Sequence, residues 1–228
     1  MAPYNDTTSC SLEKKMTLFR RSFIRLGATL AAAAALPGGL RLVTRDALAQ
    51  GLEGVAEGDI ALGPVDAPVT IVEYASMTCP HCARFHIDTF KDLKKAYIDT
   101  GKVRFIFREF PLDRVAFQAA KLARCVGKDR FFAFLDVLFR KQQSWSRAPD
   151  PGAELAKLAR LAGVGKARMD ACLADKQIGT EILKRRIEAV KVYKIDSTPS
   201  FVINGRVYAG ALPLEEFDKI LKPLLPKS

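Results

Sequence analysis

A Cys-x-x-Cys motif that directly follows a strand-like stretch is the feature that most constrains this sequence. Residues 71–74 are mostly β-branched, aromatic or otherwise apolar, which is typical of a buried central strand. From Cys79 onward the apolar residues take helical spacing, which predicts a helix running from Cys79 to about Thr100. Cys79 and Cys82 therefore stand at a strand-to-helix junction, which is the sequence form of a dithiol redox site.

The predicted position of Cys79 favours a reactive thiolate. The thiolate is the form that carries out exchange, and free N–H groups at a helix N-terminus favour an anion. Pro80 suits the first turn because its missing N–H would have no partner there, and a protonated His81 would add positive charge. We therefore expect a lowered pKa for Cys79, which makes its disulfide a strong oxidant. Cys82, one turn later, is predicted to be the resolving thiol, with a pKa raised by burial.

Other chemistry for these cysteines is less well supported by the residues present. A zinc site needs about four ligands, and Cys79, Cys82 and His86 supply three. Covalent haem attachment needs a histidine directly after the second cysteine, where Ala83 stands. The sequence therefore predicts no metal and no cofactor, and a merely structural disulfide remains the alternative.

Glu73 is a carboxyl group within the apolar strand, six positions before Cys79. If its side chain faces the core, it lies near the cysteines and can take or give the proton of Cys82. The alternative is a glutamate that points to water from the edge of a sheet.

The first 49 residues have the features of a targeting segment. Arg20-Arg21 forms a twin-arginine motif, an Ala-rich apolar run covers residues 26–36, and Ala47-Leu48-Ala49 has the form of a cleavage site. We predict a twin-arginine signal peptide over residues 1–49, cleaved near Ala49, and export of a bacterial protein to the periplasm. The alternatives are the general secretory route and an amphipathic N-terminal helix that stays in the cytosol.

The chain is basic, with a formal net charge of +11. Residues 1–49 hold seven Lys or Arg and three Asp or Glu, so their removal leaves +7. The basic residues are scattered over predicted helices and do not alternate with aromatic ones. We therefore predict a solvated basic surface and no nucleic-acid partner.

The remaining pattern predicts an α/β fold with a mixed central sheet and an inserted α-helical domain. Residues 59–63 form a short edge strand, and residues 103–109 form a strand parallel to the central one. The pattern is helical over residues 111–193, with a long loop predicted over residues 144–152. An Asn-Gly hairpin follows at Asn204, and a closing helix covers residues 214–221.

Cys125 and Cys172 both fall in the helical part. In an oxidising compartment two such cysteines usually pair. Two buried free thiols are the alternative, because the sequence does not show whether their Cα atoms come within bridging distance.

From residue 59 to residue 221 the chain resembles the DsbA-type thiol–disulfide oxidoreductases, which have the thioredoxin fold. The resemblance depends on Glu73, the Cys-Pro-His-Cys sequence, the helical insertion and Thr198-Pro199 before the Asn-Gly hairpin. It implies a thioredoxin-like domain in two parts, residues 50–110 and 194–228, around a helical insertion over residues 111–193. The spacing of Cys125 and Cys172 is similar to that of the second cysteine pair in alphaproteobacterial members.

The resemblance also implies a role for each site residue. Cys79 is the sulfur that substrate thiolates attack, and Cys82 resolves the mixed disulfide. Glu73 handles the buried proton. Pro199 is a cis-proline that faces the cysteines, and the backbone of Thr198 pairs with extended substrate peptide.

The implied function is the introduction of disulfides into reduced exported proteins by a monomer. Its electrons would pass to a membrane quinone reductase of the DsbB type. Strongly oxidising members often carry valine where this chain has Thr198, so a disulfide isomerase or reductase of the same fold is an alternative. A second alternative is a peptide-binding chaperone module without catalysis.

Overall fold

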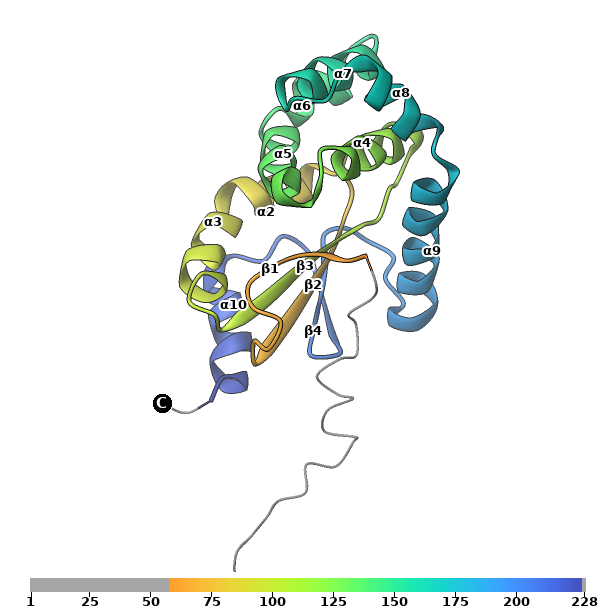
Figure 1. Cartoon of the computed structure of the whole chain (residues 1–228). Helices are drawn as coiled ribbons and strands as arrows, with labels where there is room; N and C mark the ends of the chain where they lie inside the picture. The colour runs from red at the N-terminus through yellow and green to blue at the C-terminus, as the bar shows by residue number, and fades with distance from the viewer. Residues whose placement is uncertain (1–57, 227–228) are drawn as a thin grey trace, which may run out of the picture. The chain divides into compact units, whose positions relative to one another are not determined.

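A five-stranded mixed sheet forms the centre of the protein in a computed structural model, which describes residues 58–226 (Figure 1). The strand order is β1-β3-β2-β4-β5, with β2 parallel to β3 and every other neighbouring pair antiparallel. The predicted edge strand and the predicted parallel pair are both confirmed. The strands are β1 (Ile60–Leu62), β2 (Val69–Ala75), β3 (Val103–Glu109), β4 (Ser200–Ile203) and β5 (Arg206–Ala209).

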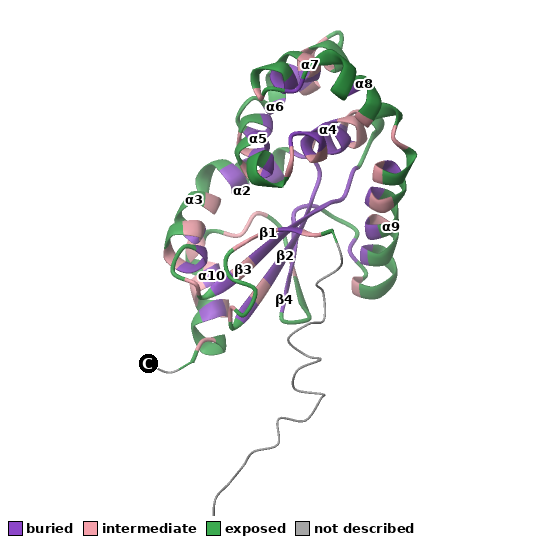
Figure 2. Cartoon of the chain, in the orientation of Figure 1, coloured by how far each residue is buried: buried purple, intermediate pink, exposed green. Residues whose placement is uncertain are grey.

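Helices surround this sheet, and each one is buried on its inner side and exposed on its outer side (Figure 2). A π-helical segment (Lys94–Ile98) extends α3, and a 3-10 turn (Lys222–Leu224) follows α10. The α-helices are α2 (Pro80–Asp88), α3 (Phe90–Leu93), α4 (Arg114–Cys125), α5 (Lys128–Arg140), α6 (Gln142–Ser146), α7 (Pro151–Leu161), α8 (Lys166–Ala174), α9 (Lys176–Tyr193) and α10 (Leu214–Leu221).

Two of these elements differ from the sequence prediction. The helix predicted from Cys79 to about Thr100 is interrupted at Thr89, a β-branched residue whose φ of −115° departs from helical values. The loop predicted over residues 144–152 begins inside α6, which is too short to show helical periodicity. Trp145 in α6 is buried, and its ring N–H donates to the backbone oxygen of Leu138, so this segment packs as part of the core.

The Asn-Gly hairpin between β4 and β5 is confirmed. Asn204 and Gly205 both have positive φ, 44° and 81°, as the tightest hairpin turns require.

Side chains of β2 alternate between the two faces of the sheet. Val72 and Tyr74 join a cluster with Ala189 of α9 on one face. Ile71 and Ala75 belong to the larger cluster on the other face, which also holds Phe85 of α2. Because strand side chains alternate with a period of two, Glu73 points to the same face as Ile71 and Ala75, the face that α2 covers.

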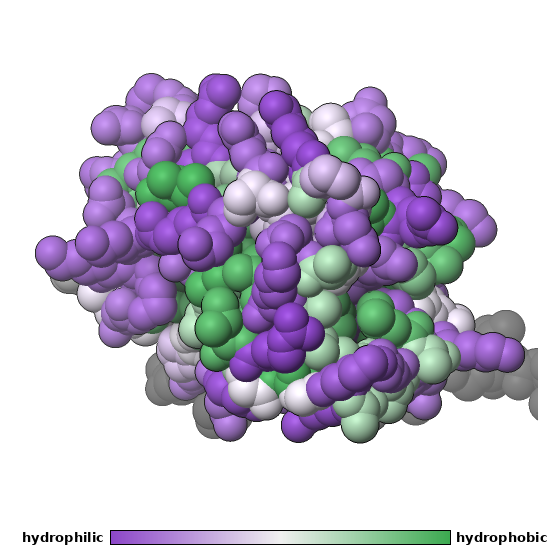
Figure 3. Space-filling view, turned by 90° about the horizontal axis from the view of Figure 1, so that it is seen from above, coloured by the Kyte–Doolittle hydropathy of each residue, from purple (hydrophilic) through white to green (hydrophobic). Residues whose placement is uncertain are grey.

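The inserted helices lie between β3 and β4 in the sequence. In Figure 1, α4 to α8 gather beyond one end of the sheet, and α9 runs along the sheet on its return. Seen from the helical end, the surface is largely hydrophilic, with hydrophobic residues gathered near its middle (Figure 3). Within residues 58–226, no helix combines the length and the apolar character that crossing a bilayer demands. The predicted signal peptide and its cleavage site near Ala49 lie outside the described residues.

Candidate active site

Cys79 occupies the N-cap position of α2, directly after the loop that leaves β2. Its backbone N–H donates to the oxygen of Ser76 at 3.1 Å, which fixes the turn, and Pro80 takes the first helical position as predicted. Cys79 and Cys82 are both free thiols in this structure. Cys79 keeps 6% of its surface exposed, whereas Cys82 is fully buried. Both cysteines are thus largely buried, and Cys79 is the more accessible of the two.

The segment that precedes β4 lies against Cys79, although it is more than a hundred residues away in the sequence. The Thr198–Pro199 peptide bond is cis. The Cys79 thiol donates to the backbone oxygen of Thr198 at 3.2 Å. The structure therefore brings together the cysteine motif and the Thr-Pro segment.

The pKa of Cys79 is lowered from its ordinary value of 9.0 to about 5. The largest cause is a hydrogen bond from the Cys82 thiol, and burial opposes the shift. The backbone N–H groups of Cys82 and His81 also contribute, as the position at a helix N-terminus predicts. The hydroxyl of Thr198 lowers this pKa too, although it forms no hydrogen bond of normal geometry. The lowering of the Cys79 pKa agrees with the sequence prediction. Its main cause, however, is the Cys82 thiol and not a charge on the exposed His81 side chain.

Cys82 shows the opposite behaviour. Burial raises its pKa well above 9.0, and the hydrogen bond with Cys79 and the charge of Glu73 raise it further. The pKa values of these two thiols, three residues apart, therefore differ strongly. Cys79 ionises easily, whereas Cys82 holds its proton.

Glu73 is fully buried on the face of the sheet that α2 covers, so the alternative of a water-facing glutamate is wrong. Its Oε2 lies 2.8 Å from Nε2 of His86, which is one turn after Cys82 on α2. Its Oε1 has no hydrogen-bond partner within the described residues. We call these two side chains the Glu73–His86 pair. The sequence analysis weighed His86 only as a zinc ligand, although its i+4 relation to Cys82 places it on the same helix face.

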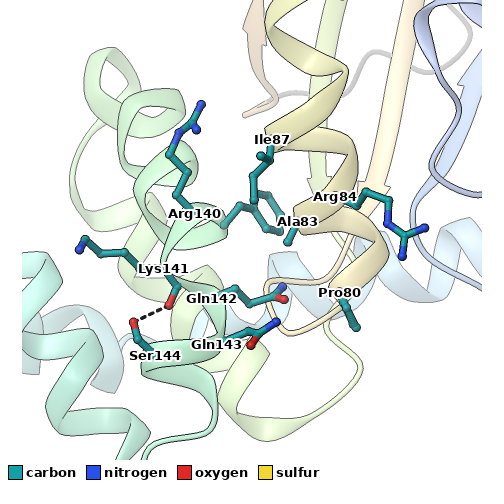
Figure 4. A pocket seen from close by; sticks show the side chains of 10 residues that line it. Pro80, Ala83, Arg84, Ile87, Arg140, Lys141, Gln142, Gln143 and Ser144 are labelled. Atoms are coloured by element: carbon teal, nitrogen blue, oxygen red, sulfur yellow. Dashed lines mark hydrogen bonds between the residues drawn. The ribbon is translucent and has the colours of Figure 1, made fainter.

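Gln142 is a second site residue that the sequence analysis missed. Its side-chain amide donates to the backbone oxygens of Met77 and Cys79, both at 2.9 Å. It lies in α6, a helix too short to show a helical pattern in the sequence. Figure 4 shows a pocket beside it, between α2 and the segment of residues 139–144, with Pro80 and Ala83 on the opposite wall.

Within the described residues, no group of three or more His, Cys, Asp or Glu side chains is placed to hold a metal ion. The second cysteine pair is bonded: Cys125 at the end of α4 forms a disulfide with Cys172 in α8, with Cα atoms 6.2 Å apart. The pairing predicted for these cysteines is confirmed, and two free thiols are excluded.

Comparisons with known proteins agree with this fold. A family model described as Thioredoxin matches residues 55–223. A crystal structure of alpha-DsbA1 from Wolbachia pipientis is 31% identical, with a TM-score of 0.72 and coverage of 77% of this chain and 94% of that one. A protein-disulfide isomerase from Novosphingobium aromaticivorans is 27% identical, with a TM-score of 0.65 and coverage of 75% and 99%.

Among curated relatives, a Rickettsia bellii protein provisionally named a protein-disulfide oxidoreductase is 36% identical over 152 residues. The match covers 66% of this chain and 59% of that protein, so the chain spans less than two thirds of this relative's length. The chain belongs to the thioredoxin family. Within that family it is a member of the DsbA type, with the expected mixed sheet and helical insertion.

Proposed function

We propose that this protein is a thiol–disulfide oxidoreductase that introduces disulfides into reduced exported proteins through Cys79 and Cys82. The observation that carries the proposal is the pKa of about 5 of a Cys79 thiol that lies at a helix N-terminus and keeps part of its surface exposed. A thiol with a low pKa is a good leaving group, and it stabilises the reduced protein relative to the disulfide.

In the first step, a substrate thiolate attacks Sγ of Cys79 in the oxidised protein. A new bond joins the substrate sulfur to Cys79, the Cys79–Cys82 bond breaks, and Cys82 leaves as a thiolate. Because Cys82 is buried and its pKa is raised, this thiolate takes up a proton at once. Glu73 is the group that we assign to supply it.

In the second step, another substrate thiolate attacks the substrate sulfur of the mixed disulfide. The substrate disulfide forms and Cys79 leaves as a thiolate, which needs no proton at neutral pH because of its low pKa. The reduced protein then passes two electrons to an oxidant, for which a DsbB-type membrane quinone reductase is the proposed partner.

The backbone around Pro199 suits the binding of extended peptide. Thr198 presents its carbonyl oxygen to Cys79 at the start of β4, so a substrate strand that binds there places its cysteine beside the reactive sulfur. Periplasmic location and removal of residues 1–49 remain part of this proposal, since an oxidising compartment keeps such a dithiol supplied with oxidant.

The reduction potential of the Cys79–Cys82 pair, measured against glutathione, tests the proposal. We expect a potential more oxidising than about −200 mV, whereas a value at the cytosolic poise of roughly −220 to −260 mV would contradict the oxidase role. Cys79→Ala should abolish all thiol exchange, and Cys82→Ala should accumulate mixed disulfides with substrate.

A disulfide isomerase is the second candidate, supported by Thr198 before the cis-proline and by the likeness to the Novosphingobium isomerase. Refolding of a substrate with scrambled disulfides separates the two functions. An isomerase restores native pairing from its reduced form, and an oxidase only forms new disulfides.

A further inference from the structure

The Glu73–His86 pair has a role in proton transfer that rests on the proposed function. His86 retains 3% of its surface exposed and Glu73 none, so both side chains are removed from water. The Nε2–Oε2 distance of 2.8 Å is that of a well-formed hydrogen bond. It is the only hydrogen bond that the Glu73 side chain makes among the described residues.

Within residues 58–226, the aromatic rings that contact His86 are all phenylalanines. Its ring stacks on Phe139 of α5 with centroids 4.4 Å apart. Phe85 of α2, Phe90 of α3 and Phe107 of β3 contact its other sides. None of these four side chains titrates, so Glu73 and Cys82 are the ionisable groups that the histidine can influence. Phe139 also lines the pocket of Figure 4, which brings solvent to within one aromatic ring of His86.

This hydrogen bond can exist in both protonation states of the carboxyl group. When Glu73 is ionised, the Nε2–H of His86 donates to Oε2. When Glu73 carries a proton on Oε1, the same Nε2–H still donates to Oε2. The bond therefore fixes the carboxyl plane whichever way the proton is held, and it leaves Oε1 as the atom available to Cys82.

We propose that His86 is the positioning residue of the buried proton transfer: it holds Glu73 so that Oε1 exchanges a proton with the Cys82 thiol, and it stabilises the ionised carboxylate in between. The charge of Glu73 acts on Cys82, so the two groups are close enough for their protonation states to be coupled. An ionised carboxylate without the histidine would lie among phenylalanine rings with no donor, which strongly disfavours it.

The step that depends on this arrangement is the attack of Cys82 on a mixed disulfide at Cys79. The Cys82 proton passes to Oε1 of Glu73, the Cys82 sulfur bonds to Cys79, and the bond between Cys79 and the second thiol breaks. That thiol leaves as a thiolate, and Glu73 is left protonated and bonded to His86. In the opposite direction Glu73 returns the proton to the Cys82 thiolate.

An aromatic disulfide whose released thiolate is coloured tests this step by stopped flow. The reduced protein reacts in two phases: Cys79 attacks the reagent and releases one thiolate, and Cys82 then attacks the mixed disulfide and releases the second. His86→Phe should slow the second phase by about tenfold or more at neutral pH and move its pH profile upward. The first phase should change by less than about twofold. His86→Gln, which retains an N–H donor, should recover most of the rate.

A double-mutant cycle identifies the route by which His86 acts. If the histidine works through Glu73, then Glu73→Gln/His86→Phe is no slower in the second phase than Glu73→Gln alone. Phe131→Leu is the matched control, since this buried ring of α5 contacts Phe107 and Phe132 and makes no ring contact with His86. Phe131→Leu should lower the stability of the protein without shifting the pH profile of the second phase.

Three outcomes would overturn the inference. They are an unchanged second phase in His86→Phe at every pH, a further slowing by His86→Phe in the Glu73→Gln background, and a shifted pH profile in Phe131→Leu. Failure of the first phase in the wild-type protein would instead contradict the proposed function itself.

Discussion

The two faces of the central sheet both bury ionisable side chains, but these side chains differ in how completely they are paired. On the face that α9 covers, Asp59 accepts from Arg108 at 2.8 Å and from Arg185 of α9. Arg108 also donates to the hydroxyl of Tyr74 at 2.8 Å. Each carboxylate oxygen of Asp59 thus has an arginine partner, and this cluster joins the start of β1 to β2, β3 and α9.

On the face that α2 covers, Glu109 accepts from Arg124 through both of its oxygens, but the buried Glu73 is only half satisfied. Glu73 has one partner, His86, and its second oxygen has none within the described residues. Buried polar groups are almost always paired, so an unpaired oxygen beside a thiol indicates a group kept available for chemistry. Full pairing therefore marks the structural carboxylates, and half pairing marks the one near the reactive thiols.

The largest expected effect on stability comes from removing the charge of Asp59, the carboxylate that is paired with two arginines. Asp59→Asn leaves two arginines buried without their carboxylate, and we expect a loss of about 3–5 kcal/mol in the free energy of unfolding. Urea denaturation measures it, with the exposed Asp66→Asn as control. Both phases of thiol exchange should keep their rates in the folded protein. A loss below about 1 kcal/mol would show that the cluster is not the structural one.

The disulfide between Cys125 and Cys172 gives a reference for a purely structural element. It closes a loop with a sequence separation of 47, for which the chain-entropy estimate is about 4 kcal/mol. Cys125→Ser/Cys172→Ser should lose about that much stability and retain the reduction potential of Cys79 and Cys82. A potential that moves with this pair would contradict the separation of structural from reactive cysteines.

A smaller effect on stability is expected from pH, through the ionisation of Cys79. The pKa of Cys79 in the folded, reduced protein lies at about 5, below its ordinary value of 9.0. The unfolded chain therefore binds the extra proton between these values, and stability of the reduced protein rises with pH across that window. The contribution is complete above pH 9.0, at most about 3 kcal/mol at pH 7, and lost as pH falls through about 5. Urea titrations of the reduced protein against Cys79→Ser measure it, and parallel curves for the two proteins would refute it.

The smallest expected change in stability follows Glu73→Gln. Replacing a half-paired buried carboxyl group by a neutral amide should change the unfolding free energy by no more than about 1 kcal/mol, with a gain as the favoured sign. The same variant should lower the pKa of Cys82, because the charge of Glu73 contributes to raising it. Alkylation of Cys82 as a function of pH reports this shift. A stability loss as large as that of Asp59→Asn would contradict the distinction between fully paired and half-paired buried carboxyl groups.

Most of the fold follows from patterns that are local in the sequence. The strands, the parallel pair and the Asn-Gly turn each depend on a few neighbouring residues, and all are present. Two features with a weak local signal were not predicted from the sequence. Helix α6 has only five residues, and the interruption at Thr89 involves a single residue within a helical pattern.

The site residues likewise divide into those that a local motif predicts and those that depend on contacts between distant segments. Cys79, Cys82 and Pro80 are defined by a short motif, and their positions agree with it. The cis-Pro199 was reached through family resemblance, since no local pattern compels it. The contacts of His86 and Gln142 join segments far apart in the chain, and the hydrogen bond from Cys82 that dominates the pKa of Cys79 depends on side-chain orientation.

Gln142 connects the inserted helices to the backbone of the turn that carries the reactive sulfur. Its amide holds the carbonyl groups of Met77 and Cys79, which are the backbone on both sides of the turn that presents the thiol. A substrate that pushed α6 outward would have to break both hydrogen bonds and loosen that turn. The helical insertion therefore helps to hold the backbone that presents the nucleophile, through hydrogen bonds from a residue more than sixty positions away.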